Sequence, residues 1–263
     1  SAPRHTDREW RQVSVNHRDC LGAAKCPFGE ECFAEVAKDK AQKSHLIVTN
    51  HSLLAIDAIE GVPMIPEYDA VVIDEAHELV ARVTQAATDE LTAAEVERAA
   101  RRAQKHIEGS EADDLADASD ALRAAINETS PGRLITLPEV VSDALVLVRD
   151  AARSAISALP KPKDSEGADP GFQQAKGGLQ EVFTTAERMA AASEHDVIWL
   201  NEGGDRIPPR LCVAPLQVWA QMREKLLTEK TVVFASATLK LGGDFGPVAG
   251  SLGLKAEERT AVG

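Results

Sequence analysis

Two adjacent carboxylates, Asp74 and Glu75, come directly after the apolar segment Ala70-Val-Val-Ile73, and His77 follows them. In nucleotide-binding α/β sheets, ligands bind beyond the carboxyl ends of the strands. A carboxylate there can hold Mg²⁺, which neutralises phosphate charge, and a second carboxylate can orient an attacking water. The pattern therefore favours hydrolysis of a nucleoside triphosphate. The alternative is a solvated acidic pair that opens a helix, where carboxylates are favoured by the helix dipole.

Two hydroxyl side chains, Ser236 and Thr238, follow a second apolar segment at residues 231–235. Hydroxyls two residues apart can hydrogen-bond to a neighbouring loop, although the same pattern also occurs at an ordinary strand end with a capping threonine. Like Asp74, this motif directly follows an apolar, strand-like segment. The presence of both motifs therefore makes a functional interpretation of each one stronger.

Three of the four cysteines are evenly spaced near the start of the chain, as Cys20-x₅-Cys26-x₅-Cys32. Four cysteines in 263 residues do not make a disulfide scaffold, so the three are interpreted as metal or cluster ligands. The spacing leaves open an iron–sulfur cluster, a zinc site completed by His17, and unliganded buried thiols. The fourth, Cys212, lies in an apolar extended stretch and is predicted to be a buried structural thiol.

The apolar segments predict the frame that positions these motifs. Residues 46–50, 70–74 and 231–236 are short and rich in β-branched residues, which is typical of strands buried on both faces of a parallel sheet. Residues 217–228 have a helical period, which predicts a helix that leads into the last strand. The predicted fold class is therefore α/β.

The sequence changes character between the second and third predicted strands. Residues 85–208 contain 13 Lys and Arg against 23 Asp and Glu, a net charge of −10. Thr92 begins a capping box, and three apolar stripes at helical spacing follow it. The Pro- and Gly-rich residues 160–171 exclude regular structure, whereas residues 197–200 and 211–213 predict a hairpin. A mostly helical module is thus predicted within the α/β domain.

Together, these motifs resemble those of the DinG-type and XPD-like iron–sulfur helicases of superfamily 2. Asp74-Glu-Ala-His77 resembles helicase motif II, and Ser236-Ala-Thr-Leu239 resembles motif III. Thr49-Asn-His-Ser-Leu-Leu54 resembles the Asn-His-x-Leu segment of DinG-type helicases. Cys26-Pro-Phe28 and Cys32-Phe33 resemble part of the family's iron–sulfur segment. The chain also follows the family order of cluster segment, motif II, helical arch and motif III.

The resemblance implies part of a RecA-like parallel-sheet motor domain with two additions. Residues 1–45 would form the iron–sulfur cluster segment, and residues 46–84 the portion of motor domain 1 that carries motif II. Residues 85–208 would form the inserted helical arch. Residues 209–263 would continue motor domain 1 with motif III and begin the crossing to motor domain 2.

The resemblance also implies a role for each motif residue. Asp74 would hold the Mg²⁺ of Mg-ATP, Glu75 would be the general base, and His77 would sense the nucleotide state. Ser236 and Thr238 would couple ATP turnover to movement on DNA.

For the cysteine segment, the resemblance favours iron–sulfur over zinc. Cys20, Cys26 and Cys32 would bind a 4Fe-4S cluster whose fourth ligand lies upstream of this chain.

Candidates for DNA contact precede the first cysteine. Arg11 and Arg18 offer positive charge for phosphates and Trp10 could stack on a base, although a solvated mixed-charge face is the alternative. The net charge of −13 argues against general adsorption to nucleic acid or membranes, so a binding face would have to be local. No apolar run is long enough to predict a membrane span.

The function implied by the resemblance is an ATP-dependent 5′–3′ DNA helicase that acts on single-stranded and forked DNA in repair and replication-fork processing. We expect a bacterial, cytoplasmic, nucleoid-associated monomer. The sequence contains no Gly-x₄-Gly-Lys-Ser/Thr phosphate-binding loop, so the chain alone is expected to be inactive. Two alternatives remain: a helicase-like motor fused to an exonuclease, and a non-catalytic zinc-stabilised module that binds nucleic acid.

Overall fold

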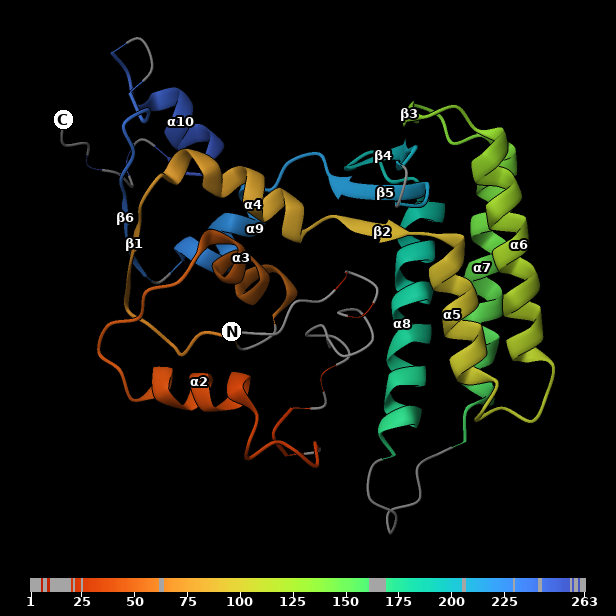
Figure 1. Cartoon of the computed structure of the whole chain (residues 1–263). Coiled ribbons are helices and arrows are strands. Elements are labelled where there is room, and N and C mark those ends of the chain that lie inside the picture. The colour runs from red at the N-terminus through yellow and green to blue at the C-terminus, as the bar shows by residue number, and fades with distance from the viewer. Residues whose placement is uncertain are drawn as a thin grey trace.

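The computed structural model describes residues 6, 9, 20, 22–24, 26–61, 64–160, 169–204, 207–228, 230–240, 243–255, 257 and 260. Helix α2 (Phe33–Gln42) contributes to neither core, and the described residues from 50 onward fall into two parts, one around a parallel strand pair and the other around a group of long helices (Figure 1). Among the described residues, no helix is both long and apolar enough to cross a membrane. The predicted DNA-contact residues Trp10, Arg11 and Arg18, and the alternative zinc ligand His17, lie outside the described residues.

The first part is built on strands β1 (Ala70–Ile73) and β6 (Thr231–Phe234), which pair in parallel. The pairing continues beyond the strand ends, because the Ala235 N–H donates to the carbonyl of Ile73 at 2.8 Å. The Ala76 N–H in turn donates to the carbonyl of Ala235 at 3.0 Å. The polar motifs that follow the two strands therefore meet at one edge of the sheet.

Helices pack on one face of this strand pair. They are α3 (His51–Glu60), the 3₁₀ turn η1 (Ala76–Glu78) with α4 (Leu79–Ala86), α9 (Trp219–Met222) with the π-helical turn η2 (Arg223–Leu227), and α10 (Gly246–Ser251). The predicted helix before the last strand is thus confirmed, and it buries its apolar stripe. The core of this part consists of Leu54, Ala55, Ile73, Ala76, Leu79, Val83, Ala87, Val218, Met222, Leu226 and Leu252.

Two expectations about the strands are wrong. Residues 46–50 are not a strand, and Leu46 and Val48 are 82% and 90% exposed. The strand pair is also not buried on both faces, because Val72 is 71% exposed beside the exposed Val233. A β-branched composition favours extended backbone, but a strand also needs a partner for its N–H and C=O groups. Within the described part of the chain, no strand pairs with residues 46–50.

The second part contains four helices that pack side by side (Figure 1). They are α5 (Ala93–Ala103), α6 (Glu111–Glu128), α7 (Glu139–Ala158) and α8 (Pro170–Ala191). The capping box predicted at Thr92 is present, with the Thr92 hydroxyl accepting from the Glu95 N–H at 3.1 Å. The predicted apolar stripes form one core, which includes Leu115, Leu122, Leu145, Val148, Leu179 and Met189.

An antiparallel sheet covers one end of these helices. Its strands are β2 (Asp89–Leu91), β3 (Gly132–Arg133), β4 (Asp196–Asn201) and β5 (Arg210–Pro215), in the order β2-β5-β4-β3. The predicted hairpin is confirmed as β4 and β5. Because β5 pairs with both β2 and β4, it belongs to the helical part, although the expected boundary at residue 208 precedes it.

Cys212 lies within β5 and is 1% exposed, which confirms the prediction of a buried thiol. Burial, with a further contribution from the nearby Glu90 carboxylate, raises the pKa of this thiol to about 11. The thiol is therefore protonated at neutral pH, as expected for a packing residue.

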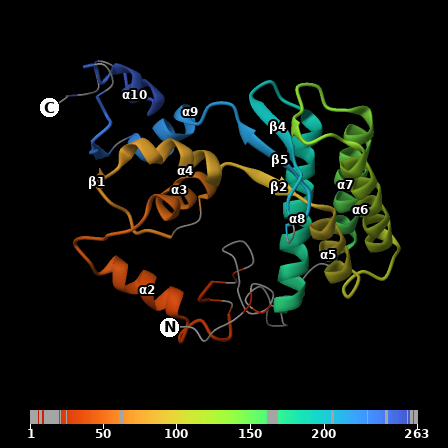
Figure 2. The same ribbon diagram turned by 45° about the horizontal axis from the view of Figure 1, so that its top comes forward.

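Arg188 of α8 holds the junction between the two parts. Its guanidinium donates to the carbonyl of Ala87, at the end of α4, at 3.1 Å and to Asp89 of β2 at 2.7 Å. It also makes a forked contact with Asp196 of β4 at 2.6 and 3.2 Å. Burial acts to lower the pKa of Arg188, but the hydrogen bonds to Asp196 and Asp89 outweigh it and raise that pKa. Asp89 begins β2, which follows α4 and runs beside β5 (Figure 2).

Candidate active site

The chain turns sharply after β1, and this turn presents the two predicted carboxylates. Glu75 has φ +45° and ψ +45°, a left-handed conformation that costs about 1–2 kcal/mol for a residue with a Cβ. The following residue, Ala76, is fully buried, so its small side chain lets the turn pack against the core. Leu79 is fully buried as well and holds the start of α4. A strained residue between a strand and a buried anchor is the kind of outlier that marks functional sites.

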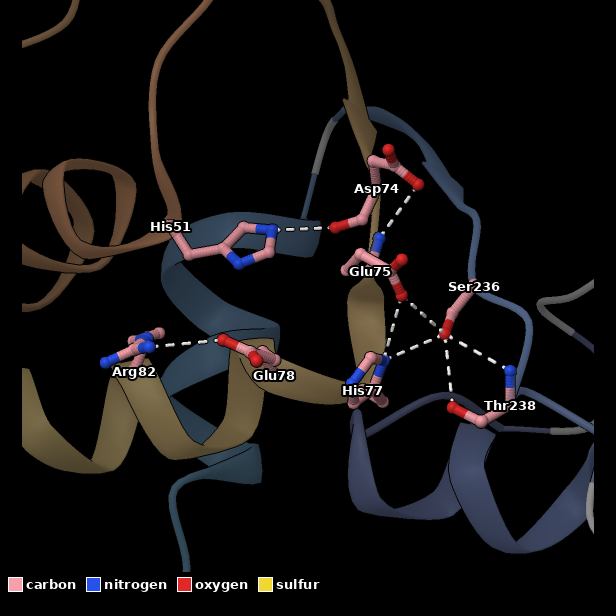
Figure 3. Close-up of polar contacts among 8 residues, drawn as sticks. All are labelled: His51, Asp74, Glu75, His77, Glu78, Arg82, Ser236 and Thr238. Carbon is pink, nitrogen blue, oxygen red and sulfur yellow. Dashed lines mark hydrogen bonds and ion pairs between the residues drawn. The ribbon is translucent and has the colours of Figure 1, made fainter.

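The peptide unit that joins Asp74 to Glu75 has a partner on each side (Figure 3). Its N–H, which belongs to Glu75, donates to the Oδ1 atom of Asp74 at 2.9 Å. Its carbonyl, which belongs to Asp74, lies 2.8 Å from Nε2 of His51. A carbonyl oxygen can only accept, so Nε2 carries the proton in this contact.

The two motifs contact each other through Ser236 (Figure 3). The Ser236 hydroxyl lies 2.9 Å from Nδ1 of His77 and 3.4 Å from Oε2 of Glu75. It also lies 3.2 Å from the Thr238 hydroxyl and accepts from the Thr238 N–H at 3.3 Å. Nδ1 of His77 is in addition 3.3 Å from Oε2 of Glu75. The structure thus joins Glu75, His77, Ser236 and Thr238 in one network.

The geometry suits general-base chemistry at Glu75. The side chains of Glu75 and His77 are 60% and 44% exposed, so a substrate and a water can reach them. The hydrogen-bond partners of Glu75 hold the direction of its carboxylate without covering it. A carboxylate held in this way can orient a water molecule and accept its proton.

Asp74 fits the donor set of a magnesium site. Its side chain is exposed at the carboxyl end of β1, and Oδ1 already accepts from the Glu75 N–H. Protein sites for Mg²⁺ usually offer one or two carboxylates and leave the remaining positions to water and substrate phosphates. A single exposed carboxylate at a strand end meets that requirement.

The structure does not bring the three predicted cluster ligands together. Cys32 is the N-cap of α2 (Phe33–Gln42), whereas the Cys26 carbonyl accepts from the Gly29 N–H at 3.0 Å in the preceding turns. Cys20 is exposed. Throughout the residues that the structure describes, no group of three or more His, Cys, Asp or Glu side chains could hold a metal ion. In this structure the three cysteines are therefore not gathered into a cluster site.

One residue of the site has no role in the sequence predictions. His51 lies in the segment that resembles Asn-His-x-Leu, and this resemblance is the feature of the sequence that could have pointed to His51. The pattern does not show that the imidazole reaches the turn after β1, because that contact spans 23 residues.

Comparison with known proteins gives extended matches to helicases. The chain is 40% identical over 259 residues to the ATP-dependent helicase DinG of Mycobacterium tuberculosis H37Rv, a match that covers 95% of this chain and 39% of that protein. It is 35% identical over 74 residues to the ATP-dependent DNA helicase YoaA of Escherichia coli K12, covering 27% of this chain and 12% of that protein. No protein-family model matches the chain.

Among solved structures, the chain is similar to S. tokodaii Xpd4, with a TM-score of 0.40 and 15% identity. This match covers 70% of this chain and 37% of that one. The chain spans 39% of the length of the mycobacterial relatives that it matches.

Proposed function

The chain belongs to the DinG-type helicase family, and from that premise we propose that it carries the hydrolytic and coupling centre of an ATP-dependent DNA helicase. The observation that supports this most strongly is the contact between the two motifs. Glu75 and His77 follow β1, Ser236 and Thr238 follow β6, and one hydrogen-bond network joins them. A solvated acidic pair at a helix start would not need these partners.

Asp74 would hold the Mg²⁺ of Mg-ATP, and the ion would neutralise charge on the phosphate oxygens. Glu75 would accept a proton from the water that attacks the γ-phosphorus. As the new O–P bond forms, the bond from that phosphorus to the β–γ bridging oxygen breaks, so that ADP and inorganic phosphate are the products. His77 would stabilise the direction of the Glu75 carboxylate through their contact at 3.3 Å.

The same contacts offer a route for coupling hydrolysis to DNA movement. Ser236 shares its hydroxyl among Glu75, His77 and Thr238, so a change at the Glu75 carboxylate alters which partners that hydroxyl can satisfy. We propose that residues 89–215, which hold β2 to β5 and the four long helices, are the arch of such a helicase. Arg188 would then fix the arch to the motor.

Several parts of this proposal lie outside the 263 residues. The 263 residues contain no Gly-x₄-Gly-Lys-Ser/Thr loop, so the chain alone is expected not to hydrolyse ATP. By the complete protein we mean a natural polypeptide that carries this chain together with such a loop. We propose that it acts 5′–3′ on single-stranded and forked DNA, as a cytoplasmic, nucleoid-associated monomer.

The 4Fe-4S cluster remains a separate proposal, supported by the cysteine spacing and by the family resemblance. Iron and acid-labile sulfide, each at about four per chain in anaerobically purified complete protein, would support it. Zinc at about one per chain without sulfide would replace it with a structural zinc site.

The test of the proposed function is DNA-stimulated ATP hydrolysis and fork unwinding by the complete protein and by its Asp74→Asn variant. We expect the variant to lose both activities. Asp69→Asn is the matched control, because Asp69 is an exposed carboxylate at the opposite end of β1. Equal activity of the wild-type protein and Asp74→Asn would overturn the proposal.

A further inference from the structure

We infer that His51 is a positioning residue for the general base Glu75, an inference that rests on the proposed function. Its imidazole holds the carbonyl of the Asp74–Glu75 peptide at 2.8 Å, while the Asp74 side chain holds the N–H of the same peptide at 2.9 Å. A peptide plane held on both sides cannot rotate without breaking a hydrogen bond. The rotation of this plane is coupled to the φ angle of Glu75.

The position of His51 is fixed by a helix rather than by a loop. His51 is the first residue of α3, and the side chain of the N-cap, Asn50, accepts from the Leu53 N–H at 2.8 Å. Leu54 and Ala55 are 4% and 0% exposed and seat this first turn against the core. The first two residues of the Asn-His-x-Leu pattern therefore have separate tasks. Asn50 caps the helix and His51 reaches the turn after β1, while Leu54, the residue just after the pattern, anchors the helix in the core.

The hold matters because Glu75 adopts a conformation that it does not favour. Its φ of +45° lies in the left-handed region, from which a residue with a Cβ tends to relax. Relaxation would turn the peptide and carry the carboxylate away from His77 and Ser236, which it contacts at 3.3 and 3.4 Å. The hydrogen bond from His51 opposes that movement without touching substrate.

Three variants of the complete protein separate the donor from the bulk of the side chain. His51→Phe keeps an aromatic ring without an N–H donor, and His51→Gln keeps an N–H at similar reach. Ser52→Ala is the control, because Ser52 is an exposed neighbour in the same turn. In DNA-stimulated ATP hydrolysis, we expect His51→Phe to lower kcat about fivefold to tenfold, with KM for ATP within about twofold of wild type. His51→Gln should restore most of kcat, and Ser52→Ala should match wild type.

Hydrogen exchange of the peptide around Glu75 gives a readout that does not depend on ATP turnover. We expect faster exchange in His51→Phe and near wild-type exchange in His51→Gln. Wild-type kcat in His51→Phe, or a loss in His51→Gln as large as in His51→Phe, would overturn the inference. If the wild-type protein does not hydrolyse ATP, the proposed function fails. Hydrogen exchange then still tests the inference, because unchanged exchange around Glu75 in His51→Phe would show that the hydrogen bond from His51 does not hold this turn.

Discussion

Nδ1 of His77 lies 2.9 Å from the hydroxyl oxygen of Ser236, although 159 residues separate them in the sequence. The parallel pairing of β1 with β6 produces this contact, since the register continues past the strand ends as far as Ala235. The helical part is inserted between the two strands without disturbing their register. The sheet can therefore maintain the contact between His77 and Ser236, because the inserted helical part is stabilised by a separate core of its own.

This contact predicts coupled effects of two substitutions. In the complete protein, His77→Ala and Ser236→Ala should each lower kcat/KM for ATP, but the double variant should lose less than the sum of the two. We expect a coupling energy of about 0.5–1.5 kcal/mol, the range of a typical hydrogen bond. The measurement is a double-mutant cycle, and His195→Ala is the control because His195 is exposed on the helical part. Strict additivity would contradict the contact.

Thr238 predicts a loss of coupling rather than of chemistry. Its hydroxyl and N–H both contact the Ser236 hydroxyl, so within the described network it reaches Glu75 only through that serine. Thr238→Val removes the hydroxyl while keeping the shape of the side chain. We expect more ATP to be hydrolysed per base pair unwound, measured by running both assays on one forked substrate. An unchanged ratio would show that the Thr238 hydroxyl is not part of the coupling.

The junction between the two parts depends on Arg188. Arg188→Ala leaves the Asp89 and Asp196 carboxylates, both largely shielded from solvent, without their shared cation. We expect the free energy of unfolding to fall by about 2–3 kcal/mol, measured by urea denaturation. Arg188→Lys should recover only part of this, because an ammonium cannot make the forked contact.

The matched control for that prediction is Arg149→Ala on α7. Arg149 pairs with Asp150 at the surface, where ion pairs contribute little. We expect a much smaller loss of stability than in Arg188→Ala. If Arg188→Ala is no more destabilising than Arg149→Ala, the junction is not held by the guanidinium.

Cys212 predicts a pH dependence of stability. Burial raises the pKa of its thiol from 9.0 to about 11, so the folded protein keeps a proton that the unfolded chain releases over this interval. The stabilisation that this proton provides is complete below pH 9 and is lost as the pH rises through about 11. The difference in unfolding free energy between wild type and Cys212→Ala should therefore shrink from pH 8 to pH 10.5. A constant difference would contradict the raised pKa.

Local patterns predicted much of the site and of the helices. Asp74 and Ser236 were predicted at the ends of apolar strands, and the parallel pairing that joins those ends is present. The capping box at Thr92 depends on residues within one helical turn, which is why the sequence predicts it well.

Features that depend on distant partners could not be predicted in this way. Residues 46–50 have the composition of a strand, but composition does not supply a neighbouring strand. The contact of Arg188 with the Ala87 carbonyl spans 101 residues, and nothing in the local sequence distinguishes this arginine from others on the helices. The role of His51 likewise becomes visible only when α3 is placed beside the turn after β1.

The central claim, that Glu75 is the general base of an ATP-hydrolysing site, is tested most directly by Glu75→Gln in the complete protein. Glutamine preserves the size of the side chain but cannot accept the proton of the attacking water. The measurement is DNA-stimulated ATP hydrolysis beside nucleotide binding, with Glu78→Gln as the control from the same exposed turn. We predict that Glu75→Gln still binds ATP and loses at least about 100-fold in kcat. Wild-type kcat in Glu75→Gln would contradict the account.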